Sequence, residues 1–141
     1  MNYYFGNEDM CMEKLEYSKL NYSLQHDSTE AQRILTSFVD RYVDREKLKR
    51  YILMWNSFIY KPKCLPIEAF QDMMLPSEKN VFFYDEREKA LYSTTMKDVV
   101  YFVKNLEPWD QVDACIFDRD MNWVVAVTHE DVILCLGDID N

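Results

Sequence analysis

The sequence predicts an α+β domain in which N-terminal helices pack on one face of a mostly antiparallel sheet, ending in a C-terminal three-stranded meander. Apolar residues recur at helical spacing in the first half of the chain. The last third has three short apolar runs separated by turn-type residues, which is typical of strands. The 141 residues contain only two glycines and no repeat, so we expect a single domain over residues 1–141.

The first helix is predicted over residues 28–42, where apolar residues recur at intervals of three and four. Ser28 or Thr29 is the expected N-cap because a hydroxyl side chain accepts a hydrogen bond from the first turn. A second helix is expected to begin after Asp44 and to extend to Phe58. Its predicted buried stripe consists of Leu48, Tyr51, Ile52, Trp55 and Phe58.

The sequence of the middle of the chain predicts two more helices and a strand. Pro66 suits the first turn of a short helix. Residues 81–84 are aromatic and β-branched, which indicates a strand. Another helix is predicted over residues 95–106, with Thr94 or Thr95 as its cap, on the same face of the sheet as the earlier helices.

Three apolar runs, at residues 114–117, 123–127 and 132–136, form the predicted meander. An alternative interpretation makes residues 128–131, Thr-His-Glu-Asp, a capping box for a C-terminal helix. Five consecutive apolar residues closed by Gly137 favour the strand.

The composition argues against several classes of protein. The N-terminal residues lack the features of a secretory signal and no apolar run exceeds five residues, so we expect a cytoplasmic protein without a membrane partner. Two isolated glycines cannot form the loops that bind nucleotide phosphates, and we expect no cofactor. The cysteines are too scattered for paired metal-binding or redox motifs, so reduced thiols are expected at Cys11, Cys64, Cys115 and Cys135.

Charge is distributed unevenly along the chain. The formal net charge is −9. Residues 107–141 carry nine acidic residues against one basic residue, Arg119, whereas residues 41–63 carry seven basic residues against two acidic ones. The acidic segment would repel nucleic acid and attract a cationic surface, so we expect a basic protein partner and no nucleic acid.

The meander would gather candidate functional residues at one end of the sheet. Antiparallel strands reverse direction, so Asp113 should come close to the turn at residues 129–131, whereas Asp118 and Asp120 should lie roughly 16 Å away. Trp109 is the tryptophan expected to be exposed, and tryptophans are favoured anchors in protein interfaces. The predicted partner-binding residues are Trp109, Asp110, Asp113, His129, Glu130 and Asp131.

The leading interpretation is a protein-binding module rather than an enzyme, and an immunity-type inhibitor of a basic toxin is one form of it. A metal-dependent hydrolase is an alternative, because Asp113, His129 and Asp131 offer oxygen and nitrogen ligands. The spacing argues against it, since adjacent residues in a turn point in different directions. We therefore predict no catalytic or metal-binding residue.

A second alternative is self-association, giving a homodimer in which the basic helix of one copy contacts the acidic end of another.

Residues 53–70 (LMWNSFIYKPKCLPIEAF) and 113–131 (DACIFDRDMNWVVAVTHED) resemble a bacterial family of small single-domain proteins of unknown function. The family pattern begins the first segment with Leu-Trp-His, where residues 54–56 here read Met-Trp-Asn. It ends the second with a tryptophan, a short apolar strand and Thr-His-Glu, which Trp123 and residues 128–130 match. The resemblance implies a fold and a bacterial, cytoplasmic setting, and the missing histidine argues against a two-histidine metal site.

Overall fold

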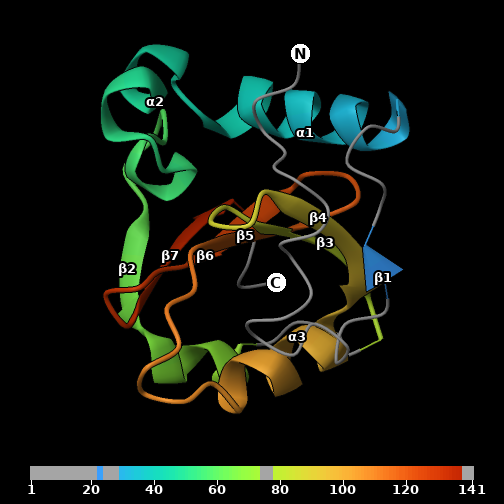
Figure 1. The fold of residues 1–141 in the computed structure, drawn as a ribbon, viewed down its shortest axis with the longest axis vertical. Helices are drawn as coiled ribbons and strands as arrows, with labels where there is room; N and C mark the ends of the chain where they lie inside the picture. The colour runs from blue at the N-terminus through green and yellow to red at the C-terminus, as the bar shows by residue number, and fades with distance from the viewer. Residues whose placement is uncertain (1–21, 24–28, 74–77, 138–141) are drawn as a thin grey trace.

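The structure, a computed structural model, describes residues 22–23, 29–73 and 78–137. Its seven-stranded sheet has the order β1-β4-β3-β5-β6-β7-β2, and all neighbouring strands are antiparallel (Figure 1). The strands are β1 (Tyr22–Ser23), β2 (Lys63–Pro66), β3 (Asn80–Asp85), β4 (Ala90–Thr95), β5 (Ala114–Asp118), β6 (Trp123–Val127) and β7 (Val132–Gly137). The helices are α1 (Thr29–Tyr42), α2 (Arg45–Tyr51) and α3 (Met96–Lys104), with 3₁₀ helices η3 (Met54–Asn56) and η4 (Ile67–Asp72). The predicted α+β class is confirmed, and none of these helices is long and apolar enough to cross a membrane.

Helices cover both faces of the sheet. α1 lies over one face, whereas α3 and η4 cover the other (Figure 1). The prediction that α3 shares a face with the N-terminal helices is therefore wrong. The side chains of β5 and β6 are buried on both faces, so each face needs its own covering layer.

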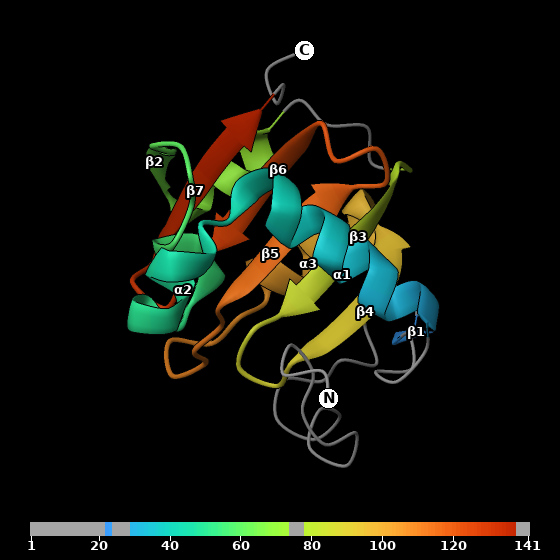
Figure 2. The same ribbon diagram turned by 90° about the horizontal axis from the view of Figure 1, so that it is seen from above.

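α1 packs as its sequence predicts and lies across the sheet when seen from above (Figure 2). Phe38 stacks on Phe117 of β5, with ring centroids 4.3 Å apart. The Tyr42 hydroxyl donates a hydrogen bond of 2.7 Å to the carbonyl oxygen of Met121, which joins the end of α1 to the β5–β6 turn. Ser28, one of the two predicted caps, lies outside the described residues.

The second helix is shorter than predicted. Asp44 caps α2 as expected, because its Oδ1 accepts hydrogen bonds from the backbone N–H groups of Glu46 and Lys47. However, α2 ends at Tyr51, and Ile52 follows with a φ of 75°. Tyr51 and Ile52 are 45% and 77% exposed, so the predicted buried stripe does not include them.

The 3₁₀ helix η3 replaces the second half of the predicted helix. The backbone N–H groups of Met54 and Trp55 donate to the Glu86 carboxyl group at 2.6 and 3.3 Å, and the Trp55 indole donates to Asp113 at 2.9 Å. These bonds tie η3 to the sheet and replace the helical bonds lost beyond Tyr51. Local sequence does not predict them, because both carboxyl groups come from distant parts of the chain.

The middle of the chain contains strands that the sequence analysis missed. β3 includes the predicted strand at residues 81–84, and Thr95 caps α3 by accepting a hydrogen bond from the Asp98 backbone. β4 was missed because Ser93 and Thr94 give it a polar sequence, although both are buried. The helix predicted after Pro66 is the 3₁₀ helix η4, and Pro66 itself ends the edge strand β2.

In the last third, β5 pairs with β6 and β6 pairs with β7. Residues 132–137 form a strand, so the alternative of a C-terminal helix is wrong. Cys115 faces α1 and Cys135 faces α3, on strands separated by β6, and both are free thiols. Cys11 lies outside the described residues.

Candidate functional site

The predicted approach of Asp113 to the turn after β6 is confirmed. Asp113 immediately precedes β5, and His129 follows β6 by two residues. The Asp113 Oδ1 atom lies 3.0 Å from the backbone nitrogen of His129 and 2.9 Å from its Nδ1 atom. The antiparallel reversal between β5 and β6 brings these two residues together.

Asp113 is fully buried and accepts hydrogen bonds from three side chains as well as one backbone group. Besides the two bonds from His129, Trp55 Nε1 donates at 2.9 Å and Arg87 Nε donates at 2.7 Å. Burial by itself would raise the pKa of Asp113, but the bonds from His129, Arg87 and Trp55 outweigh it and lower the pKa below 3.8. Asp113 is therefore an internal anion, and the prediction that it contacts a partner at the surface is wrong.

His129 is held in one orientation by this anion. Because ionised Asp113 only accepts hydrogen bonds, the Nδ1 atom of His129 is the donor in this pair. The Trp55 indole packs against the His129 ring at 5.9 Å between centroids, in an edge arrangement. One third of the His129 side chain remains exposed.

The turn that carries His129 is also fixed by its own hydrogen bonds. The Thr128 hydroxyl donates to the Val132 carbonyl oxygen at 3.0 Å and accepts from the Glu130 backbone at 3.2 Å. Asp131 has a φ of 62°, and its carbonyl oxygen accepts from the Ile67 backbone at 3.1 Å. The side chains of His129, Glu130 and Asp131 are thus exposed on a rigid turn.

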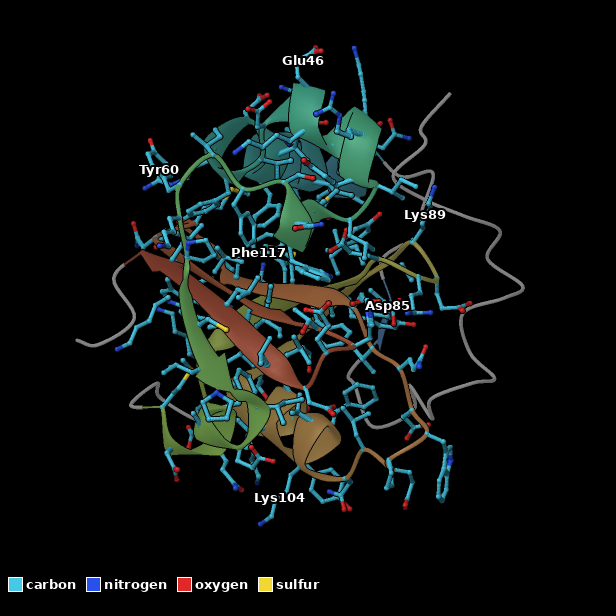
Figure 3. The ribbon with its side chains drawn as sticks, turned by 90° about the vertical axis from the view of Figure 1, so that its left-hand side faces the viewer. Glu46, Tyr60, Asp85, Lys89, Lys104 and Phe117 are labelled. Carbon is cyan, nitrogen blue, oxygen red and sulfur yellow. The ribbon has the colours of Figure 1, made fainter. Side chains whose placement is uncertain are left out.

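A second group of carboxyls, which the sequence analysis missed, lies next to Asp113 in the β3–β4 turn. Glu86 is buried, and its backbone N–H donates to the Asp113 carbonyl oxygen at 2.7 Å. Burial raises the pKa of Glu86 from 4.5 to about 8, and the nearby charges of Asp113 and Asp85 add to the rise. Burial likewise raises the pKa of Asp85 from 3.8 to about 7. Figure 3 shows the labelled Asp85 side chain at this end of the sheet.

These residues gave no signal in the sequence. The segment Asp85-Glu86-Arg87-Glu88 follows a predicted strand and has the composition of a solvent-exposed turn. Its burial depends on η3 packing against it, since Met54 and Trp55 supply the hydrogen bonds that Glu86 accepts.

A pocket of about 270 Å³ lies beside His129. Apolar side chains from η4, α3 and β6 form much of its lining, including Phe70, Val103 and Val127. The charged or titratable residues that line it are Glu68, Lys104, Glu107, Asp110, His129 and Asp131. The acidic groups therefore outnumber the single lysine around an apolar floor.

The structure places the six predicted site residues differently with respect to this pocket. His129, Asp110 and Asp131 line this pocket, whereas Asp113 is buried behind His129. Trp109 is 76% exposed, as predicted, and lies in the loop between α3 and β5. The exposed Glu130 follows His129 in the turn but does not line the pocket.

The described residues offer no group of three or more histidine, cysteine, aspartate or glutamate side chains that could hold a metal ion. Both oxygens of Asp113 already accept hydrogen bonds, so Asp113 does not join His129 and Asp131 in a metal site. At the opposite end of the sheet, Asp118 is buried and accepts a bond of 2.7 Å from the Asn122 backbone. Asp120 is exposed there.

The fold and this site define a small α+β domain in which a buried aspartate holds a partly exposed histidine beside an acidic pocket. The chain belongs to a family of unknown function (DUF6756), which it matches over residues 11–141. The predicted resemblance to a family of unknown function is confirmed. No curated protein and no solved structure matches the chain. The two segments that carried the resemblance meet in the structure, where Trp55 of the first contacts Asp113 and His129 of the second.

Proposed function

We propose that the chain is a protein-binding module that holds a basic segment of a partner protein at this acidic end of the sheet. The observation that carries the proposal is the pocket beside His129, which combines an apolar floor with four acidic residues, Glu68, Glu107, Asp110 and Asp131. Lysine and arginine have the matching chemistry, because their methylene stems pack on apolar surface while their charged ends bind carboxylates.

The carboxylates are available for this role. The side chains of Glu68, Glu107 and Asp131 form no ion pair within the described part of the chain. Asp110 accepts a hydrogen bond of 2.9 Å from the Glu107 backbone, which fixes the loop that carries both residues. A cationic side chain in the pocket would therefore gain new ion pairs without breaking existing ones.

The Asp113–His129 pair supports binding by holding the pocket wall in place. Asp113 joins the His129 turn, Arg87 of the β3–β4 turn and Trp55 of η3 through bonds of 2.7–3.0 Å. A wall that is already ordered loses little conformational entropy on binding. Asp113 is thus a positioning residue, and His129 and Asp131 are the groups that would face the partner.

Trp109 adds an apolar contact close to the pocket. Its side chain is 76% exposed, and its neighbours Glu107, Pro108 and Asp110 all line the pocket. Exposed tryptophans beside charged residues are frequent energetic centres of protein interfaces. The proposed partner surface therefore combines basic side chains with an apolar site for the indole.

An immunity-type inhibitor is the form of this function that we favour. Toxins that act on nucleic acids present cationic clefts, and an acidic protein surface accelerates and orients association with such a cleft. A cytoplasmic location would be consistent with that role.

Calorimetric titration with a synthetic peptide of alternating arginine and alanine tests the proposal. We expect binding at low ionic strength that weakens in about 1 M salt, where the Debye length is about 3 Å. Asp131→Asn should weaken binding by about twofold to fivefold, as expected for one exposed ion pair. Asparagine also tolerates the positive φ of 62° at this position.

Asp120→Asn is the matched control, because it removes an exposed acid at the opposite end of the sheet. It should leave the affinity unchanged. The proposal would be contradicted if the wild-type protein did not bind the peptide, or if the two variants lost affinity equally.

A further inference from the structure

A second and larger pocket, of about 490 Å³, lies between α2 and the end of the β3–β4 hairpin. Its apolar lining comes from Leu48, Ile52, Leu53, Met54 and Tyr84. Its charged lining consists of Arg45, Glu46, Lys49, Glu86 and Lys89. Figure 3 labels Glu46 on α2 and Lys89 on the hairpin, at the two sides of this region.

The charge of this pocket is opposite to that of the pocket beside His129. Its lining contains three basic residues, Arg45, Lys49 and Lys89, and two acidic residues, Glu46 and Glu86. Glu86 is buried. Because burial raises the pKa of Glu86 to about 8, this group carries a proton at neutral pH and adds little negative charge. The pocket therefore fits an apolar group that is flanked by anions.

Ile52 independently marks this pocket as a binding surface. It is a β-branched residue with a φ of 75°, a conformation that such residues adopt at a cost. It is also 77% exposed, so its apolar side chain gains little from burial within the described part of the chain. Its backbone N–H is held by a 2.8 Å bond to the Leu48 carbonyl oxygen. A strained and exposed isoleucine at a pocket is explained if another molecule covers it.

The chain itself carries a group with the complementary chemistry. Trp109 is 76% exposed, and Glu107 and Asp110 flank it. Its loop follows Lys104, which lies at the bottom of Figure 3, whereas α2 with Glu46 lies at the top. Trp109 therefore cannot reach the α2 pocket of its own chain and could fill only that of a second copy.

We propose that the chain self-associates head to tail, with Trp109 of one copy inserted into the α2 pocket of the next. Glu107 and Asp110 would then lie against the basic side of that pocket, where Lys49 is exposed and forms a solvent-exposed ion pair of 3.3 Å with Glu46. The two contacting surfaces differ, so repeated association gives chains or a ring rather than a two-fold dimer. Self-association and the basic partner would compete for Trp109, Glu107 and Asp110 of one copy, whereas the α2 pocket takes part only in self-association, so the two proposals can be tested separately there.

Sedimentation velocity of the full chain, from micromolar to millimolar concentration at low ionic strength, tests this proposal. The wild type should form dimers and larger species as concentration rises, and about 1 M salt should shift it toward monomer. Trp109→Ala should weaken association by about tenfold or more, as expected for a central interface aromatic. Tyr60→Ala is the matched control, because Tyr60 is an exposed aromatic residue that does not line the pocket, and it should associate like the wild type.

A charge exchange identifies the surfaces in contact. Lys49→Glu and Glu107→Lys should each weaken association, and the double variant should recover it because the ion pair is restored with reversed sign. Circular dichroism checks that each variant is folded. The proposal is overturned if the wild type stays monomeric at every concentration. It is also overturned if the Trp109→Ala variant associates like the wild type, or if the double variant does not recover association. Lys49 does not line the pocket beside His129, so Lys49→Glu should leave the affinity for the arginine–alanine peptide unchanged. A failure of self-association can therefore be distinguished from a failure of peptide binding.

Discussion

Replacing Glu86 with glutamine should make the stability of the protein less sensitive to alkaline pH. Burial raises the pKa of Glu86 from 4.5 to about 8 in the folded protein. The folded state therefore binds a proton more tightly than the unfolded state between these two pH values. By linkage, the contribution of this group is fully present below pH 4.5 and is lost as the pH rises toward 8.

The size of the effect follows from the same shift. One pKa unit corresponds to 1.36 kcal/mol, so a change from 4.5 to about 8 amounts to roughly 5 kcal/mol at alkaline pH, of which roughly 3–4 kcal/mol is lost between pH 5 and 8. Asp85, with a pKa raised to about 7, adds to the loss in the wild type and remains in the Glu86→Gln variant. The free energy of unfolding of the variant should still fall with rising pH, but less steeply than that of the wild type.

Urea unfolding at a series of pH values from 5 to 9 measures this slope. Glutamine cannot ionise but keeps one carbonyl oxygen for the Met54 or Trp55 backbone, so the variant should fold and be modestly destabilised at pH 5. Glu68→Gln, at an exposed glutamate, is the matched control and should follow the wild type. If wild type and Glu86→Gln lose stability in parallel, the buried carboxyl does not titrate in this range and the reasoning is refuted.

Two other predictions concern stability. Asp113→Asn should reduce the free energy of unfolding by about 1–3 kcal/mol, because it weakens the charge-assisted hydrogen bonds to Asp113 while Arg87, whose side chain is 41% exposed, stays hydrated, and no measurable loss in urea unfolding would contradict the assigned bonds. In the wild type, the stabilisation from ionised Asp113 is present above its ordinary pKa of 3.8 and is lost as the pH falls through the lower folded value. Gly137→Ala should lower the melting temperature, since a Cβ at this φ of 91° would lie 2.2 Å from the Asn122 carbonyl oxygen, and an unchanged melting temperature would show that β7 ends differently.

Local sequence patterns predicted the elements whose signals are local. α1 and α3 follow their apolar spacing, α3 begins after its predicted cap Thr95, and the C-terminal runs become β5, β6 and β7. The approach of Asp113 to His129 could be predicted because it needs only the reversal between two consecutive strands.

Features that depend on distant packing could not be predicted. The end of α2 depends on Glu86 and Asp113, which bind Met54 and Trp55 from other parts of the chain. The face covered by α3 was not determined by the sequence, because the adjoining strands are apolar on both sides. Glu86 was missed because a charged residue after a strand normally lies in a solvated turn, and its burial requires η3.

Amide NMR spectra recorded during titration with the arginine–alanine peptide test most directly whether the acidic pocket binds a basic segment. We expect shifts at the amides of Glu107, Trp109 and Asp110 and of residues 128–131, where the loop and turn line or flank the pocket. Residues 118–122, at the opposite end of the sheet, should remain unchanged. Shifts confined to that opposite end or to α2, or the absence of any shift at low ionic strength, would contradict the proposed function.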